Sequence, residues 1–231
     1  MQINSLSTGD WRLKMENQII SFDVYFDYYW PWCYIAAVRL NRLEDEFKGS
    51  LAVSWKSYLI REEGVTVFDE YIASHFQRAN EHEEAISFNP WKSGPYPTWG
   101  MPALKAIKAA ALQGKEKQDR FHLAVMKAFY TDGRDISNEQ VLEKVAEEEG
   151  LITEKFSREF NNPKWERIVY SETKDAKERL GISSIPAVVV HNRYLVEGAV
   201  SVSHYKRVIE EVNTSSGKEW LGIPSTYCRV G

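Results

Sequence analysis

The sequence predicts an α/β fold in which a four-stranded mixed sheet is interrupted, along the chain, by an all-α insertion. Three observations lead to this prediction. The first 60 or so residues have a strand, helix, strand pattern. About a hundred residues with only helical patterns follow. Strand character then returns near Ala187 and ends in a last helix. Neither half could cover a sheet alone, so the two halves should form one sheet with helices on both faces.

The composition is that of an ordinary globular protein. The chain has 231 residues, of which 43% are hydrophobic and 27% charged. The net charge of −4 provides no basic field, which argues against nucleic acid as a partner. No apolar run approaches the ~20 residues that span a bilayer, and residues 1–17 lack the apolar core of a signal peptide. We therefore expect no membrane partner and a cytoplasmic location; the oligomeric state is left open.

The two cysteines, Cys33 and Cys228, give no sign of a disulfide scaffold and fit a reducing compartment. Cys228 lies in a C-terminal tail without helical or strand periodicity, and a bridge between the two is left open. Aromatic residues are abundant, and several fall in loop-like segments. They indicate either an aromatic-lined cleft or a packed seam between domains.

The first half of the core reads as a strand, a helix and a strand. Residues 19–26 form a short apolar segment typical of a buried strand. Residues 31–46 repeat apolar side chains at helical spacing, and Gly49 suits the end of that helix. Residues 51–60 alternate as a second strand. A helical crossover between neighbouring strands implies a right-handed parallel pair.

The middle of the chain is predicted to be helical. A loop rich in proline, glycine and tryptophan, residues 88–100, interrupts it. Pro102 and Gly114 suit the start and the end of a helix over residues 102–113. Ser137 and Gln140 fit a capping box that opens the helix over residues 137–149. The expected helices cover residues 68–86, 102–113, 118–130, 137–149, 153–160 and 163–180.

The last part reads as a hairpin, residues 187–191 and 194–196, followed by a helix over 203–212. The whole order, β-α-β, helices, then α-β-β-α, is that of a thioredoxin-type core with a helical insertion. We expect a discontinuous core of residues 18–62 and 180–216, an insertion of 63–179 whose last helix returns to the core, and a tail of 217–231.

One motif in this core carries chemistry. The run Asp27-Tyr28-Tyr29-Trp30-Pro31-Trp32-Cys33 joins the first strand to the first helix. A cysteine in the first turn of a helix lies near the positive end of the helix dipole, which favours the thiolate. A redox C-x-x-C pair would need a second cysteine three residues earlier, and Trp30 stands there.

A second motif is the proline that opens the strand after Gly181-Ile182-Ser183-Ser184-Ile185. The Ile185–Pro186 bond is a candidate cis bond, because X–Pro is the common site for one. A cis bond would turn the Ile185 backbone outward, where it could pair with an extended substrate. An ordinary trans proline at a strand entry is the alternative.

These residues resemble the DsbA/FrnE-like thioredoxin-fold thiol–disulfide oxidoreductases. Residues 27–35 resemble the C-P-W-C-Y-(I/V) site, 181–186 the cis-proline loop and 193–199 the closing hairpin. Residues 101–106 and 130–137 resemble parts of the inserted helical domain. The resemblance covers residues 21–212 and implies a cis Pro186, a thiol or disulfide substrate, and a substrate groove shaped by Pro31, Trp32, Ile185, Pro186 and Trp99.

The departures from the family pattern concern the chemistry. Carried over by position, Trp30 replaces the attacking cysteine and Cys33 is the resolving one. An indole N–H is a donor without a nucleophilic atom, so two-cysteine turnover is closed at this motif. The related glutathione-using isomerases and kappa-class transferases have serine at the position of Trp30. Trp99-Gly100 stands where the family often has Asn-Ser or Asn-Thr.

Roles of the neighbouring titratable residues also remain open. Cys33 could be reactive by itself or a buried, inert small hydrophobe. Asp27 could accept a proton or could bind free N–H groups near the helix start, which we favour. His75 and His82 could share a metal-binding face, but a solvated charged face is the simpler expectation, so no metal is predicted.

Three functions are compatible with this sequence. The first is a thiol–disulfide oxidoreductase that acts through Cys33 alone. The second is a glutathione-dependent isomerase or transferase with its cleft under Trp91 and Trp99, so that glutathione is a possible cofactor although no tightly bound one is expected. The third is a non-catalytic module that binds a peptide or small molecule on Trp30.

Overall fold

The computed structural model describes residues 19–61, 65–83 and 86–214. Its main sheet has four strands in the order β2-β1-β5-β6. Strand β1 (Ile20–Phe26) is parallel to β2 (Leu51–Ser57) and antiparallel to β5 (Ala187–Val190), which pairs with β6 (Tyr194–Glu197). Every side chain of β5 is buried, as suits a β-branched strand in the middle of a sheet. The predicted thioredoxin-like fold and mixed sheet are confirmed.

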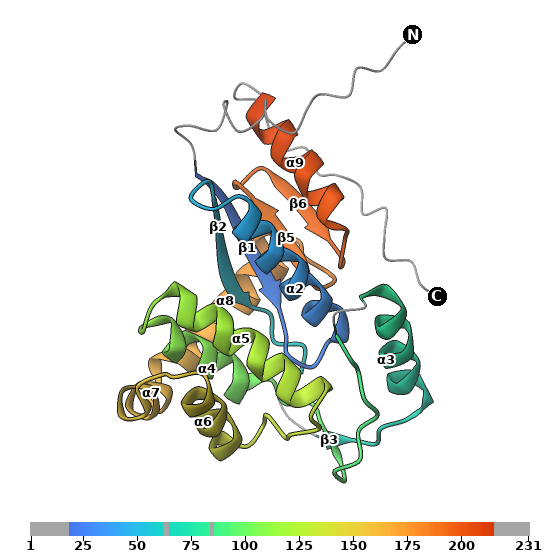
Figure 1. Ribbon diagram of the computed structural model, residues 1–231, viewed down its shortest axis with the longest axis vertical. Helices are drawn as coiled ribbons and strands as arrows, with labels where there is room; N and C mark the ends of the chain where they lie inside the picture. Colours follow the sequence, from blue (N-terminus) through green and yellow to red (C-terminus); the bar gives the residue numbers. More distant parts are fainter. Residues whose placement is uncertain (1–18, 62–64, 84–85, 215–231) are drawn as a thin grey trace.

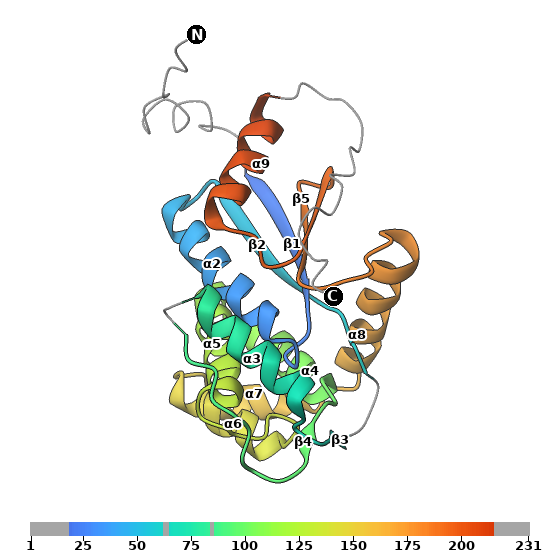
Figure 2. The ribbon, with the colours of Figure 1, turned by 90° about the vertical axis from the view of Figure 1, so that its right-hand side faces the viewer.

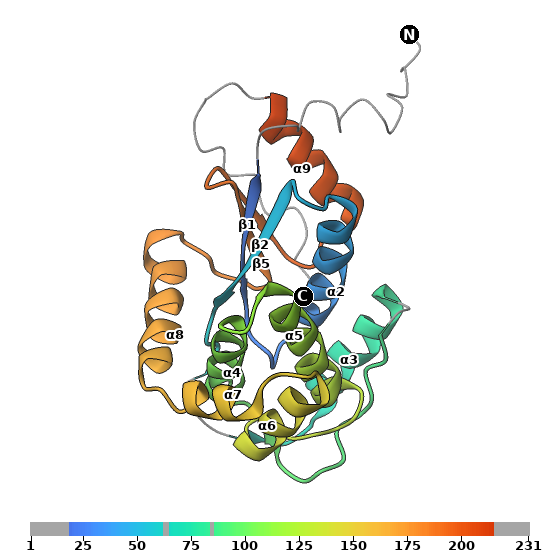
Figure 3. The ribbon, with the colours of Figure 1, turned by 60° about the vertical axis from the view of Figure 1, so that its left-hand side comes forward.

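Helices cover both faces of this sheet. Helix α2 (Pro31–Glu46) and the last helix, α9 (Val202–Thr214), lie on one face, and α8 (Lys164–Lys174) lies on the other (Figures 2 and 3). Helix α8 contacts β2, and a π-helical segment, η1 (Asp175–Arg179), continues it toward β5. The last helix of the insertion therefore packs on the core. No described helix is long and apolar enough to cross a membrane.

The inserted segment gathers beyond the end of β1 (Figure 1). It begins with a small ribbon of β3 (Val65–Thr66) and β4 (Tyr96–Pro97), between which lies α3 (Glu70–His82). The ribbon was not predicted, because strands of two residues carry no readable pattern. The remaining helices are α4 (Met101–Ala111), α5 (Lys115–Tyr130), α6 (Glu139–Glu148) and α7 (Thr153–Phe160).

Several boundaries differ from the predicted ones for local reasons. The second strand stops at Ser57 instead of residue 60, because the N–H of Ile60 binds the Asp27 carboxylate. Asn138, not Ser137, caps α6 and accepts from the N–H of Gln140. Ser137 is instead bonded to Asp135. Gly114 precedes α5 as its N-cap residue instead of ending α4.

The seam between the core and the insertion is aromatic. Phe129 of the insertion packs on Tyr29 of the core at 4.9 Å between ring centroids. Across the seam, the Tyr130 ring stacks on Tyr34 of the core at 5.9 Å, and its hydroxyl donates to the backbone oxygen of Tyr28 at 2.9 Å. Aromatic pairs of this kind contribute roughly 0.5–1.5 kcal/mol each beyond their buried area. Part of the aromatic excess in the sequence therefore joins the two halves of the molecule.

Candidate functional site

The candidate site is the turn between β1 and the start of α2. Trp30 is the N-cap residue, with an extended backbone and no side-chain cap, and Pro31 follows in the first turn. Proline suits this position because its missing N–H would have had no helical partner. The N–H of Cys33 donates to the Trp30 carbonyl at 2.9 Å. Trp30 and Cys33 therefore occupy one turn at the positive end of the helix dipole.

The Cys33 thiol is sealed inside the core. Its residue is 2% exposed and lines neither of the two cavities described below. Burial raises the pKa of Cys33 well above its usual value, the nearby Asp27 charge raises it further, and a hydrogen bond with the Asp27 backbone lowers it. Burial therefore outweighs the helix dipole, and the sulfur stays a protonated thiol at neutral pH.

Asp27 is also buried, and its carboxylate binds backbone donors. One oxygen accepts from the N–H of Tyr29 at 3.0 Å and the other from the N–H of Ile60 at 2.9 Å. Burial raises the pKa of Asp27 to about 6, although these backbone donors lower it. The expectation that Asp27 serves free N–H groups near the helix start is confirmed.

The same carboxylate explains the glycine before α4. A Cβ atom at Gly100 would lie 2.7 Å from Asp27 Oδ1, closer than a Cβ atom comes to other heavy atoms in proteins. The departure Trp99-Gly100 therefore has a structural reason at its second residue.

Trp30 faces the opposite way, into an aromatic wall. Its ring lies 4.7 Å from His75, which lies 4.7 Å from Tyr71, both measured between centroids. The Trp32 indole N–H donates to His75 Nδ1 at 3.3 Å. Burial and the neighbouring Arg78 cation lower the pKa of His75, so the ring is neutral at neutral pH.

The predicted solvated face for both histidines is therefore wrong for His75, which is buried, whereas His82 is exposed. The described residues hold no group of three or more side chains suited to a metal ion.

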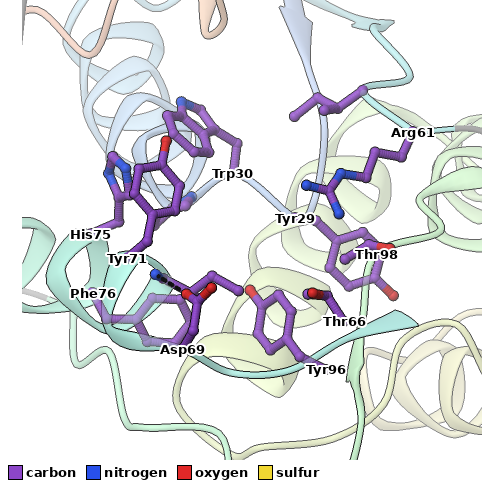
Figure 4. A pocket seen from close by; sticks show the side chains of 13 residues that line it. Tyr29, Trp30, Arg61, Thr66, Asp69, Tyr71, His75, Phe76, Tyr96 and Thr98 are labelled. Carbon is purple, nitrogen blue, oxygen red and sulfur yellow. Dashed lines mark hydrogen bonds between the residues drawn. The ribbon is translucent and has the colours of Figure 1, made fainter. Parts of the chain in front are cut away.

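Two cavities flank Trp30. The larger, of about 800 Å³, opens between α3 and the cis-proline loop, and the smaller, of about 290 Å³, lies between α3 and the ribbon (Figure 4). Four side chains line both cavities and so form their common wall: Trp30, Ile60, Tyr71 and His75. The other residues that line the larger cavity are Trp32, Tyr58, Ser74, Arg78, Lys177, Ser183, Ser184 and Ile185.

Most of the predicted groove residues meet at these cavities. Trp32 and Ile185 line the larger cavity and Pro31 lines the smaller one. The Ile185–Pro186 peptide bond is cis, which agrees with the isomer that the resemblance implies. Among the described residues, no hydrogen bond is formed by the backbone groups of Ile185.

The tryptophans of the loop before α4 do not lie over the cleft. Trp99 is 40% exposed and lines neither cavity, and its neighbour Thr98 lines the smaller one. Trp91 is buried against Phe129 and donates its indole N–H to the Gly94 carbonyl. The two cavities beside Trp30 therefore do not lie under Trp91 and Trp99, because the loop turns the Trp91 indole inward and leaves Trp99 exposed.

The sequence analysis missed the contribution of α3. Tyr71, His75 and Arg78 are four and three residues apart, so they project from one face of this helix toward the larger cavity. That spacing was the available signal. Lys177 on η1 and Tyr58 after β2 carried no such signal, because only the fold brings them to the same cavity.

Comparisons with known proteins agree with this geometry. A family profile of the DSBA-like thioredoxin domain matches residues 21–210. A Nitrosomonas europaea structure assigned as a protein disulfide isomerase is similar with a TM-score of 0.72 at 20% identity, covering 84% of this chain and 97% of that one. The cytosolic disulfide reductase DsbM from Pseudomonas aeruginosa, solved with glutathione, has a TM-score of 0.61 at 18% identity, with coverages of 84% and 95%.

A curated relative, the ClpXP adapter protein SpxH from Bacillus licheniformis, is 28% identical over 116 residues, which are 48% of this chain. The match spans only 38% of that relative's length. The structures share the fold of DsbA-like thiol–disulfide oxidoreductases, and the family profile covers most of the described residues. The chain belongs to the DSBA-like thioredoxin domain family.

Proposed function

We propose that this protein is a binding member of its family, which holds its ligand without covalent exchange in the larger cavity beside Trp30. The observation that carries the proposal is the contrast between two positions of one helical turn. The cavity meets an indole at residue 30, while the Cys33 thiol is buried away from both cavities.

Thiol exchange needs a thiolate that can reach the substrate sulfur. If Trp30 stands at the position of the attacking cysteine, that position offers a hydrogen-bond donor and an aromatic face but no nucleophile. Cys33 is both protonated and inaccessible. The same elements would still position a ligand, since Trp32, Ile185 and the α3 side chains line the cavity.

The comparisons are consistent with a binding role. One relative is named as an adapter protein, which describes a function based on binding rather than redox turnover. DsbM is named as a cytosolic reductase, and we propose a cytoplasmic location for this chain as well.

Alkylation of Cys33 tests the proposal. In a Cys228→Ser background, iodoacetamide should modify folded Cys33 at least about a hundredfold more slowly than unfolded Cys33, because a buried amide or thiol reacts only through opening of the structure. The rate is measured by mass spectrometry with and without denaturant. Modification of the folded protein as fast as free cysteine would overturn the proposal and restore Cys33 as a redox residue.

Glutathione is the second candidate ligand, and one observation favours it. The larger cavity is lined by two cations, Arg78 and Lys177, and glutathione carries two carboxylates. The DsbM structure holds glutathione. Titration should quench the fluorescence of Trp30 and Trp32 in the wild type and less so in Trp30→Phe. A flat response up to millimolar glutathione would exclude this ligand.

A further inference from the structure

The two cavities form one cleft of two compartments, divided by the ring of Trp30. We propose that this cleft binds an extended peptide segment of a partner protein, in which an acidic residue adjoins a bulky apolar one. The inference rests on the proposed binding function and names the class of partner for that site. Three features of the cleft support it in turn.

The first feature is the charge of the larger compartment. Among the described residues, its charged lining side chains are Arg78 and Lys177, in a protein with a net charge of −4. Among the described residues neither cation pairs with a carboxylate. Arg78 contacts His75 Nδ1 at 3.1 Å, and Lys177 lies 5.1 Å from the centroid of the Tyr58 ring. Both cations are held in place by neutral groups and remain available for an acidic side chain.

A carboxylate behind the cis-proline loop is bonded to that loop and does not line this compartment. Glu197 Oε1 accepts from the N–H groups of Ser183 and Ser184 and from the Ser184 hydroxyl, each at 3.3 Å. It does not line the cavity. Among the described lining residues, an acidic ligand group would therefore meet two cations and three serines rather than a carboxylate.

The second feature is the smaller compartment, whose walls are mainly apolar. Phe76, Ile72 and Tyr96 line it together with the Trp30 ring (Figure 4). Among the described residues, its charged lining side chains are Asp69 and Arg61. Asp69 caps α3 by accepting from the N–H of Ile72. A volume of about 290 Å³ suits one bulky apolar side chain rather than a whole drug-sized ligand.

The third feature is the rim between the compartments. Tyr71 is 65% exposed and Ile60 is 41% exposed, and both line the two cavities. A small ligand inside one compartment would cover only one side of these two side chains. An extended chain that crosses from one compartment to the other would cover them, and the Ile185 backbone could pair with it.

A peptide array tests the proposal. Short fluorescent peptides with all residue pairs at two adjacent central positions are screened for binding to the full-length protein by anisotropy. We expect pairs of Asp or Glu with Phe, Leu, Ile or Trp to bind best. Replacing the acidic residue by Lys should weaken binding by about tenfold or more, since like charges then meet in the larger compartment.

Protein variants connect the preference to the cleft. Lys177→Gln and Arg78→Gln should each weaken the binding of the acidic peptides about three- to tenfold. The affinity for peptides without an acidic residue should stay unchanged. Lys174→Gln is the matched control, because Lys174 is also exposed on the same helical run but lines neither cavity. Thermal unfolding checks that each variant is folded.

Equal binding of acidic and basic pairs, an unchanged affinity in both cavity variants, or no binding by any peptide would overturn the peptide proposal. The binding function fails separately, through fast alkylation of folded Cys33. Glutathione quenching without peptide binding would overturn the peptide alone and assign the cations to a small anionic ligand.

Discussion

The start of α2 has a sealed side, where Cys33 is buried in the core, and an open side, where Trp30 lines the two cavities. Cys33 points into the core with Asp27, where burial raises the pKa of both groups. Trp30 points into a cleft lined by aromatic rings, cations and the cis-proline loop. Both residues lie at the N-terminal end of α2 and so near the positive end of the same helix dipole. The dipole alone therefore does not determine whether a side chain at this turn is reactive.

The comparison teaches that accessibility decides what the turn can do. A thiol on the sealed side contributes packing volume, and an aromatic ring on the open side contributes a binding surface. The side chain on the open side therefore sets what the turn can offer a ligand, and the side chain on the sealed side contributes to packing.

Exchanging the open side chain gives the largest expected effect. Trp30→Cys would place a thiol at the helix N-terminus, three residues from Cys33, and should raise insulin reduction from background to a readily measured rate. The double variant Trp30→Cys/Cys33→Ser is the control and should not complete a turnover cycle. Insulin reduction by the wild type at the rate of Trp30→Cys would break the comparison.

On the sealed side, the buried carboxyl group of Asp27 should make the free energy of unfolding depend on pH. The folded-state pKa of Asp27 is about 6, above the 3.8 of an exposed carboxyl, so the folded state binds the proton more tightly. Stability should therefore fall as the pH rises from about 4 through 6, by roughly 3 kcal/mol at most. Urea unfolding at several pH values should show this fall in the wild type.

The variant Asp27→Asn cannot ionise at this position and should show a flatter profile over the same pH range. Asp132→Asn, which changes an exposed carboxylate, should keep the wild-type profile. Parallel profiles for the wild type and Asp27→Asn would show that the buried carboxylate does not ionise in this range.

The smallest effect is expected for Trp99, which lies outside the turn that holds Trp30 and Cys33. Trp99 is exposed and lines neither cavity, so Trp99→Ala should change the free energy of unfolding by less than about 0.5 kcal/mol and leave ligand affinity unchanged. Tyr71→Ala, at the exposed rim of the cleft, should weaken ligand binding. A loss of affinity in Trp99→Ala would return this residue to the site.

Local pattern was sufficient for much of the fold. The apolar spacing of residues 31–46 predicted α2, and the apolar run near residue 187 predicted β5. A regular spacing of apolar residues predicts a helix or a strand because one face of such an element is buried. The two-residue strands β3 and β4 have no period, and a bond to Asp27 rather than the local sequence ended β2 early.

The candidate site was only half predictable. Its motif residues, Trp30, Pro31, Trp32 and Ile185, are consecutive or lie beside a proline, so the sequence alone indicated them. Arg78 and Lys177 are about a hundred residues apart, and only the return of α8 to the core brings them to one cavity.

The sequence by itself determined the α/β core, the inserted helices, and the presence of an indole three residues before Cys33. Tertiary structure decided the rest: which of these side chains meets water, which is sealed, and which distant cations share the cleft. The physical reason is that periodicity reports the burial of regular elements, whereas the exposure of a thiol and the charge of a cavity depend on side chains that other elements supply.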